Sequence, residues 1–262
     1  MPKIISVASG KGGVGKTSMA VNLSLRLQDA YGPTLLIDTD LLMPNCHILL
    51  NAQPRSDLID VLEDRYEWFE AVHKLDSGLS FLSGRTAANL LVEANTDRLT
   101  SLLTTLKSDA NAFEYIVVDV PAGSGVGVLN TMSVSDYNLI VLLGQATSFV
   151  DAYALIKNAY LERQLAHFSA IVNIAKSSEL AKSIFENFNR TVTSFLPVKM
   201  SYNGYVTWMK DVDTSSIHGG TVSVVKSKSR ISDKMDVILK SLLLEAPVFN
   251  IKNPTISQVT SL

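Results

Sequence analysis

The chain has 262 residues, of which 47% are hydrophobic and 18% charged, and its formal net charge is −2 at pH 7. This balance excludes a disordered chain and any overall attraction to nucleic acid or to an anionic membrane. The single cysteine, Cys46, cannot form an internal disulfide, and no uncharged apolar run reaches the roughly 18 residues that a membrane-spanning helix needs. We therefore expect a protein of the cytoplasm.

Short runs of β-branched and apolar residues alternate along the chain with longer segments of helix length. The runs predict strands at 3–9, 34–40, 78–83, 114–120, 138–144, 168–175 and 194–198. The segments between them predict helices at 16–30, 57–75, 95–109 and 148–166. This order is typical of a mostly parallel, twisted α/β sheet with helices on both faces, a Rossmann-like arrangement. We expect one domain over residues 1–249 and a flexible tail over 250–262.

A glycine-rich stretch directly follows the first predicted strand. Residues 10–17 read GKGGVGKT, which satisfies the phosphate-loop pattern G-x-x-x-x-G-K-[ST], and a predicted helix follows. The glycines let backbone N–H groups point at phosphate oxygens, and the positive end of the helix lies at the same place. The pattern predicts a P-loop in which Lys16 meets the β- and γ-phosphates of a nucleotide and Thr17 ligates Mg²⁺. The loop residues expected to bind the nucleotide are Gly12, Gly13, Val14, Gly15, Lys16, Thr17 and Ser18.

Carboxylates stand at the ends of two further predicted strands. Asp38 and Asp40 end the run LLIDTD, and Asp119 ends YIVVD, an apolar run followed by aspartate that is typical of a Walker B acid holding Mg²⁺. A single aspartate at a strand end is more often a turn former. Three of them beside a phosphate loop nevertheless favour a nucleotide site.

These motifs together resemble the ParA/MinD family of P-loop ATPases. KGGVGKT is similar to the deviant Walker A box of that family, LLIDTD to its second box, and DVPAG to its switch II. The resemblance implies that Lys11 is the signature lysine, which crosses to the ATP of the other subunit in a face-to-face homodimer. It also implies that Asp40 orients the attacking water and that Asp38 supports the site.

The resemblance implies three further nucleotide contacts. Asn45 matches the switch I asparagine, Asn173 in IVNIA resembles the asparagine that reads adenine, and Pro197 in SFLPV matches the other side of the base pocket.

Within the family, the stretches DLLMPNCHILLNAQPRSDLIDVL and TSFVDAYALIKNA are most similar to the MinD-like flagellar-number regulators of the FlhG/FleN type. That likeness implies control of the position or number of a cellular structure such as the flagellum. It also implies a protein partner that stimulates hydrolysis or serves as cargo.

The C-terminal region 226–244 leaves two interpretations open. Lys226, Lys228, Arg230 and Lys234 precede an apolar stripe made of Met235, Ile238, Leu239 and Leu242. Such a helix can lie on the inner face of an anionic membrane as a peripheral contact. It can equally pack on the sheet with solvated lysines, and the acidic residues in the same segment favour this second interpretation. Direct binding of nucleic acid is not expected, because the basic cluster is short and lacks interleaved aromatic residues.

Rival functions share the phosphate loop. An ATP-dependent biosynthetic ligase or synthetase stays possible, as does a ParA-type ATPase that partitions DNA. A ligase would turn over steadily without a partner, whereas a spatial switch should hydrolyse ATP slowly when alone.

Overall fold

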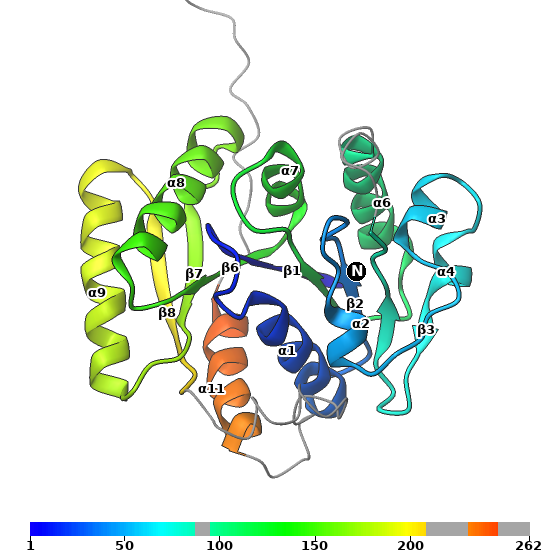
Figure 1. The fold of residues 1–262 in the computed structure, drawn as a ribbon, viewed down its shortest axis with the longest axis horizontal. Helices are drawn as coiled ribbons and strands as arrows, with labels where there is room; N and C mark the ends of the chain where they lie inside the picture. Colours follow the sequence, from blue (N-terminus) through cyan, green and yellow to red (C-terminus); the bar gives the residue numbers. More distant parts are fainter. Residues whose placement is uncertain (87–94, 208–229, 246–262) are drawn as a thin grey trace, which may run out of the picture.

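The computed structural model describes residues 1–86, 95–207 and 230–245. They build an eight-stranded sheet in the order β3-β4-β2-β5-β1-β6-β7-β8 (Figure 1). All neighbouring pairs are parallel except β3 and β4, which are antiparallel. The strands are β1 (Lys3–Ala8), β2 (Thr34–Asp38), β3 (His73–Lys74), β4 (Ser80–Leu82), β5 (Tyr115–Asp119), β6 (Tyr137–Leu142), β7 (His167–Val172) and β8 (Lys199–Tyr205).

Helices cover both faces of this sheet, as the alternating pattern predicts (Figure 1). One face carries α1 (Lys16–Ala30) and α11 (Arg230–Leu244), with the short α2 (Cys46–Leu49) beside α1. The other face carries α3 (Leu58–Leu62), α6 (Thr96–Asp109), α7 (Val126–Val134), α8 (Ala146–Arg163) and α9 (Ser178–Phe195), and α4 (Trp68–Ala71) packs beside α3. The mostly parallel α/β class is confirmed.

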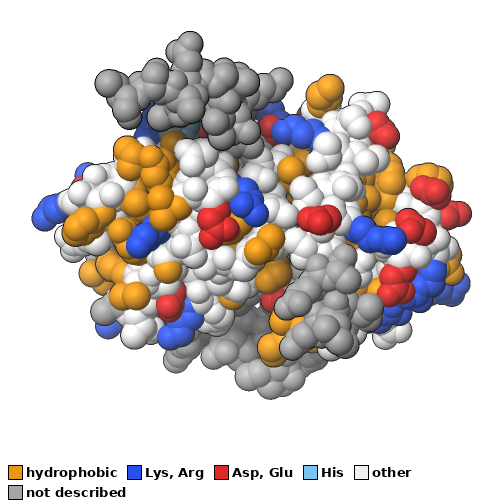
Figure 2. All heavy atoms as spheres, turned by 90° about the horizontal axis from the view of Figure 1, so that it is seen from above, with side chains coloured by type: hydrophobic (Ala, Val, Ile, Leu, Met, Phe, Trp, Pro, Cys, Tyr) orange, Lys and Arg blue, Asp and Glu red, His pale blue; other side chains and the backbone are white. Residues whose placement is uncertain are grey.

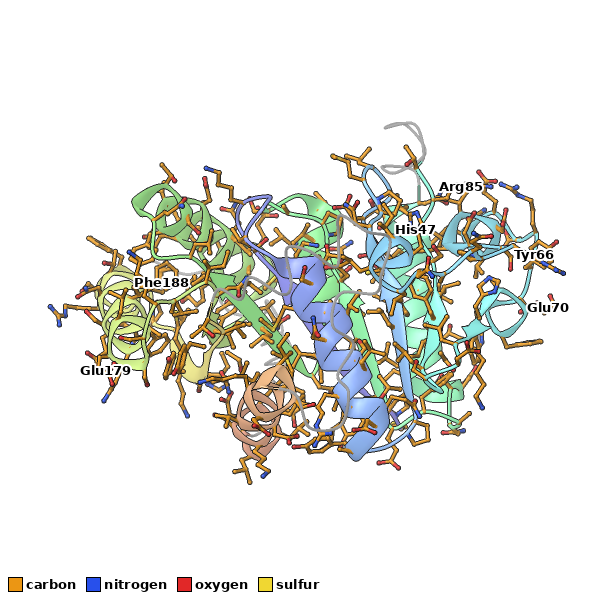
Figure 3. All side chains as sticks on the ribbon, turned by 60° about the horizontal axis from the view of Figure 1, so that its bottom comes forward. His47, Tyr66, Glu70, Arg85, Glu179 and Phe188 are labelled. Carbon is orange, nitrogen blue, oxygen red and sulfur yellow. The ribbon has the colours of Figure 1, made fainter. Side chains whose placement is uncertain are left out.

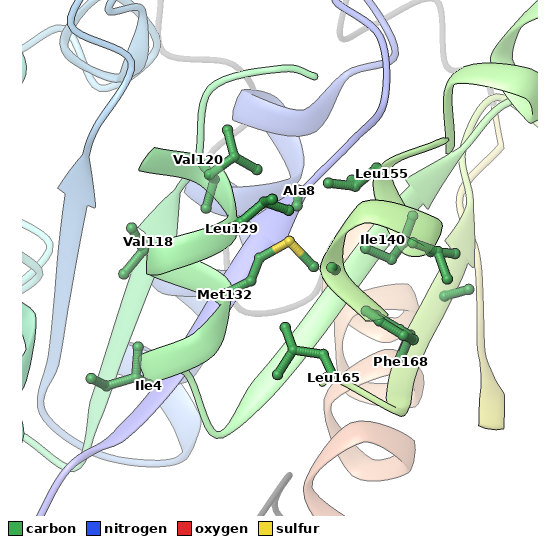
Figure 4. Close-up of a cluster of buried hydrophobic side chains, with 14 of the residues drawn as sticks. Ile4, Ala8, Val118, Val120, Leu129, Met132, Ile140, Leu155, Leu165 and Phe168 are labelled. Atoms are coloured by element: carbon green, nitrogen blue, oxygen red, sulfur yellow. The ribbon is translucent and has the colours of Figure 1, made fainter. Parts of the chain in front are cut away.

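The hydrophobic core is divided into two layers by the sheet. Along β5, Ile116 and Val118 face the cluster beneath α6 to α9, whereas Tyr115 and Val117 face the cluster beneath α1 and α11. Figure 4 shows part of the first layer, where side chains of β1, β5, β6 and β7 meet those of α7 and α8. Because the strands are buried on both faces, they read as almost continuous apolar runs in the sequence.

Two of the predicted elements are wrong. The segment 194–198 is not a strand, because α9 extends to Phe195 and β8 begins only at Lys199. The predicted helix 57–75 is broken into α3, α4 and β3, since capping boxes begin α3 at Asp57 and α4 at Glu67. The tail 250–262 lies outside the described residues, and the single domain over 1–249 stays a prediction.

The C-terminal helix α11 packs on the protein itself. Met235, Ile238, Leu239 and Leu242 are buried against α1 and β8. The Asp236 carboxylate also accepts two hydrogen bonds, of 2.8 and 2.7 Å, from the guanidinium of Arg26 on α1. The apolar stripe is therefore not available to a membrane surface in this conformation, which favours the second interpretation of region 226–244, while a peripheral membrane contact of this region stays a prediction. Lys226 and Lys228 lie outside the described residues, and no described helix is long and apolar enough to cross a membrane.

Candidate functional site

The glycine-rich loop connects the carboxyl end of β1 to α1, at the edge of the sheet where ligands bind in such folds. Gly13 and Gly15 have φ values of +77° and +87°, a left-handed conformation that glycine adopts without strain. Helix α1 begins at Lys16 with no side-chain cap and with no acidic residue in its first turn. The free N–H groups and the positive end of the helix dipole at this point favour an anion such as phosphate.

The loop is held in place by close contacts with α8 and β7. A Cβ atom added to Gly10 would lie 2.1 Å from the backbone carbon of Asp151, so only glycine fits there. The side-chain amide of Asn173, directly after β7, donates a 2.8 Å hydrogen bond to the carbonyl oxygen of Val14. The structure thus brings Asn173 to the phosphate loop through a contact with the loop backbone, and its contact with adenine stays a prediction.

A buried ion pair lies beneath the loop. The Lys16 ammonium is 2.6 Å from Oδ1 of Asp119, and the side chains of the two residues are 7% and 1% exposed. Asp119 ends β5, which pairs with β2, so that Asp38 and Asp119 stand directly opposite each other in the register. The predicted phosphate lysine and the predicted Walker B acid therefore share one buried cluster with Asp38.

Asp38 is fully buried and accepts three backbone hydrogen bonds. Its Oδ1 accepts from the N–H of Asp40 at 3.1 Å, and its Oδ2 accepts from the N–H groups of Asn45 and Cys46 at 3.1 and 3.0 Å. Burial, together with the nearby Asp119 carboxylate, raises the pKa of Asp38 to about 7. Asp38 therefore fixes the segment after β2 against the cluster.

The remaining predicted residues after β2 face outward. Asp40 is partly exposed, and its Oδ1 accepts a 3.1 Å hydrogen bond from the N–H of Met43. Asn45 is exposed, and its side-chain amide donates to the carbonyl of the same Met43 at 2.7 Å. Sequence alternation predicts Asp38 and Asp40 on one face, but Asp40 lies beyond the end of the strand and only Asp38 turns into the core.

Lys11 and Lys16 occupy opposite environments although they belong to one loop. Lys11 is exposed, and its ammonium has no ion-pair partner in the part of the chain that the structure describes. Its carbonyl oxygen accepts a 2.9 Å hydrogen bond from the hydroxyl of Ser9, which fixes the backbone at this point. The loop therefore holds one lysine inward at the cluster and leaves the other free at its rim.

The donor set fits a magnesium ion. Asp119 offers a carboxylate at the loop, and Thr17 directly follows Lys16 in the first turn of α1, where it is partly exposed. Oxygen ligands such as these are the ones that Mg²⁺ prefers. The ligand atoms of Asp38, Cys46 and Asp119 lie within 4.8 Å of one another. Burial and the two carboxylates raise the pKa of the Cys46 thiol, so Cys46 stays protonated and is a poor ligand for Mg²⁺.

One predicted residue is not brought to the site. Pro197 precedes β8, which runs parallel to β7, so it lies at the amino-terminal edge of the sheet. The phosphate loop and Asn173 lie at the opposite, carboxyl-terminal edge. The assignment of Pro197 to a base pocket is therefore corrected, and it fails for the same reason as the strand predicted at 194–198.

Sequence reasoning missed two supports of the site. Cys46 contacts both carboxylates, because its N–H donates to Asp38 and its Sγ lies 3.5 Å from Oδ2 of Asp119. The N–H of Gly123, in the loop after β5, donates a 2.9 Å hydrogen bond to the carbonyl of Ser9. The contacts of Cys46 with Asp119 and of Gly123 with Ser9 have no local signal, since each joins residues more than 70 positions apart that only the strand order brings together.

Comparisons with known proteins agree with this geometry. Residues 2–164 match a family model described as an AAA domain (AAA_31). The chain is 30% identical over 210 residues to the antiactivator FleN of Pseudomonas aeruginosa, an alignment that covers 80% of this chain and 75% of FleN. It is 26% identical over 155 residues to the flagellum site-determining protein YlxH of Helicobacter pylori, covering 59% of this chain and 53% of YlxH.

Among solved structures, the fold is similar to that of the septum site-determining protein MinD of Pyrococcus horikoshii complexed with Mg-ADP. The TM-score is 0.74 at 21% identity, over 91% of this chain and 94% of that one. The loop, the carboxylates and the matched family agree: this chain belongs to the ParA/MinD family of P-loop ATPases, which bind ATP with Mg²⁺ and hydrolyse it.

Proposed function

We propose that this protein is an ATP-dependent dimerising switch, in which ATP joins two copies and hydrolysis separates them. The observation that carries the proposal is the opposite placement of two lysines in one loop. Lys16 is buried against Asp119, whereas Lys11 is exposed at the rim without an ion-pair partner among the described residues. The exposed Lys11 side chain is therefore free to reach the phosphates of an ATP molecule held by another copy.

The residues of one copy have distinct proposed roles. The backbone N–H groups of the loop and Lys16 bind the phosphates, while Thr17 and Asp119 hold Mg²⁺, which offsets phosphate charge. In this structure Asp119 neutralises Lys16 at 2.6 Å, so nucleotide binding has to exchange this contact for contacts with phosphate and metal. Asn173, which is hydrogen-bonded to the loop at Val14, is the proposed contact of the adenine base.

Asp38, at the end of β2, and Asp40, directly beyond it, have different proposed roles. Asp40 is partly exposed and is the proposed residue that orients the attacking water. Asp38 is a positioning residue, because its carboxylate is fully buried and occupied by three backbone N–H groups. Asn45 donates its backbone N–H to Asp38, so a rearrangement of this segment on ATP binding would move Asp40 as well.

Lys11 supplies charge in trans in the proposed dimer. A cation brought to the phosphates by the second copy stabilises the charge that develops in phosphoryl transfer. It also makes dimerisation depend on ATP, because without phosphates two exposed lysines would repel each other across the interface.

The resemblance to FleN and YlxH supports a finer role in setting the number or position of flagella. This proposal includes a protein partner, which either stimulates hydrolysis or is the cargo of the switch. It also includes a location in the cytoplasm. A flagellar role predicts that deletion of the gene changes the number or position of flagella per cell. Normal flagellation in the deletion strain would leave the switch intact and reject this finer role.

The mass of the purified protein in solution tests the switch. We expect light scattering to show a monomer with Mg-ADP and a dimer with Mg-ATP, and Asp40→Ala to hold the dimer longer because it hydrolyses ATP more slowly. Lys11→Ala should bind ATP but stay monomeric and lose most hydrolysis. Lys3→Ala, which removes another exposed lysine at the start of β1, is the matched control and should dimerise normally.

Two results would contradict the proposal. If the Lys11→Ala variant dimerises tightly in ATP, then Lys11 does not act across the interface. If the wild type stays monomeric in ATP and still hydrolyses it steadily, the protein is a conventional ATP-using enzyme such as a ligase.

A further inference from the structure

A hollow of about 750 Å³ lies between α3, α4 and α6, at the end of the sheet that carries β3 and β4. Val61, Trp68 and Leu102 supply apolar lining: they are partly buried and pack against the core cluster on their inner sides. The hollow is separate from the site of the proposed function, because none of its lining residues belongs to the phosphate loop or to the carboxylate cluster.

Charged side chains surround this apolar floor, and acidic ones outnumber basic ones. The lining contains four carboxylates and two guanidinium groups: Asp64, Glu67, Glu70, Asp97, Arg65 and Arg98. Figure 2 shows acidic side chains gathered with basic and hydrophobic ones at the right-hand end of the molecule, where α3 and α4 lie. In Figure 3, Tyr66 and Glu70 stand close together at the same end.

Both arginines of the lining are already paired within the protein. Arg98 lies 2.9 Å from Asp64, and Arg65 lies 2.8 Å from Asp60 and also contacts Glu63.

Three lining carboxylates have no such partner: Glu67, Glu70 and Asp97 form no ion pair with any lysine or arginine in residues 1–86, 95–207 and 230–245. The carboxylates of Glu67 and Glu70 accept hydrogen bonds from backbone N–H groups of the α4 capping box, which carry no formal charge. The hollow therefore presents negative charge around an apolar floor that no basic side chain of the described residues balances.

Exposed aromatic rings adjoin the hollow. Tyr66 and Phe69 are 48% and 60% exposed, and the ring of Phe69 packs edge to face on Trp68 with 5.7 Å between the ring centroids. Aromatic side chains on a surface are enriched at the centres of protein interfaces, and the face of a tryptophan attracts arginine and lysine. A concave apolar floor, aromatic rings and unpaired carboxylates together describe a recognition surface for a basic chain.

We propose that this hollow docks a basic segment of a partner protein, with one apolar anchor on the floor beside Trp68 and arginine or lysine side chains at Glu67, Glu70 and Asp97. The charge of the hollow excludes a phosphate backbone or an anionic membrane as its occupant, because both would meet like charge. Burial of the anchor supplies affinity, and the three carboxylates select a basic sequence.

The position of the hollow gives such docking a route to the nucleotide site. The first turn of α6 lies against the first turn of α7, since a Cβ atom on Gly127 would be 3.6 Å from the hydroxyl of Thr96. Helix α7 directly follows the loop after Asp119. That loop is hydrogen-bonded to the start of the phosphate loop, because the N–H of Gly123 donates to the carbonyl of Ser9. The docking itself does not require the dimer, so its test is independent of the proposed switch.

A binding experiment with defined peptides tests the proposal. The probe is a peptide in which arginines flank a leucine anchor and which lacks tryptophan, and the control peptide has glutamates in place of the arginines. The chain has two tryptophans, so Trp208→Phe leaves Trp68 as the only one and makes its fluorescence a reporter of the floor. We expect the basic peptide, and not the acidic one, to bind with a shift of Trp68 emission.

A matched pair of variants tests the role of charge. Glu70→Gln combined with Asp97→Asn keeps the hydrogen-bond acceptors and removes two charges, and it should weaken binding of the basic peptide by about tenfold. Glu186→Gln removes an exposed carboxylate on α9, outside the hollow, and should leave the affinity unchanged.

Any of four results would overturn the proposal: no binding of the basic peptide, equal binding of both peptides, unchanged affinity in the double variant, or the same emission shift with spermine. The last result would mean that the hollow takes small cations instead of a protein segment.

Discussion

Replacing Gly10 by alanine tests how tightly the phosphate loop is built onto α8. The added Cβ atom would lie 2.1 and 2.2 Å from the backbone carbon and oxygen of Asp151, and 2.4 Å from the backbone nitrogen of Ala152. These atoms belong to a helix backbone and cannot rotate away as a side chain could. The loop or the helix must therefore shift as a unit.

The expected loss follows from this overlap. Overpacking of a well-packed site costs about 1–3 kcal/mol, and for a chain of this size each kcal/mol lowers the melting temperature by about 2–4 °C. We expect Gly10→Ala to lower the melting temperature of the nucleotide-free protein by about 2–12 °C. The same shift displaces the loop N–H groups, so the affinity for ADP should fall as well.

Gly12→Ala is the matched control from the same loop. A Cβ atom on Gly12 would meet no atom within 4 Å, and its backbone does not have a left-handed φ. The control should keep the wild-type melting temperature or raise it slightly, because alanine reduces the freedom of the unfolded chain. If calorimetry without nucleotide shows equal melting temperatures for the two variants, the close contact between the loop and α8 is not a structural constraint and the reasoning fails.

Two further predictions concern the carboxylate cluster and α11. Because the pKa of Asp38 is raised to about 7, the folded chain holds a proton there that the unfolded chain has lost above about pH 4, and stability contributed by this group falls as the pH rises between these values. The unfolding free energy of Asp38→Asn, relative to that of the wild type, should thus be higher at about pH 8 than at about pH 5 when both are measured by urea unfolding without metal or nucleotide. An equal difference in unfolding free energy at both pH values would reject the raised pKa. Leu239→Ala, at a fully buried position of α11, should cost about 2–5 kcal/mol of unfolding free energy, whereas Val237→Ala, at a position 59% exposed, should cost less than about 1 kcal/mol. Similar losses in the two variants would mean that the apolar stripe of α11 is not buried in solution.

The sequence alone predicts the class of fold and the chemical centre of the site. Apolar runs at nearly every strand position follow from burial on both faces, and the loop pattern around Lys16 lies within eight consecutive residues. Asp38 and Asp119 are recognisable because each directly ends such a run. These signals are local, so they survive without knowledge of the tertiary structure.

Only the tertiary structure decides which segments meet. The strand order places β5 between β1 and β2, and this puts Asp119 against Lys16 and opposite Asp38. The parallel pairing of β7 and β8 puts Pro197 at the far edge of the sheet, because α9 extends to Phe195 and β8 begins only at Lys199.

An amphipathic pattern likewise does not identify what covers it. The stripe of α11 suits a membrane as well as a core, and packing against α1 and β8 buries it. The hollow beside Trp68 has no motif at all, because its walls come from three helices separated in the chain. Residue type and spacing describe what a segment can bury or bind, whereas burial and partners depend on contacts between distant segments, which no local pattern encodes.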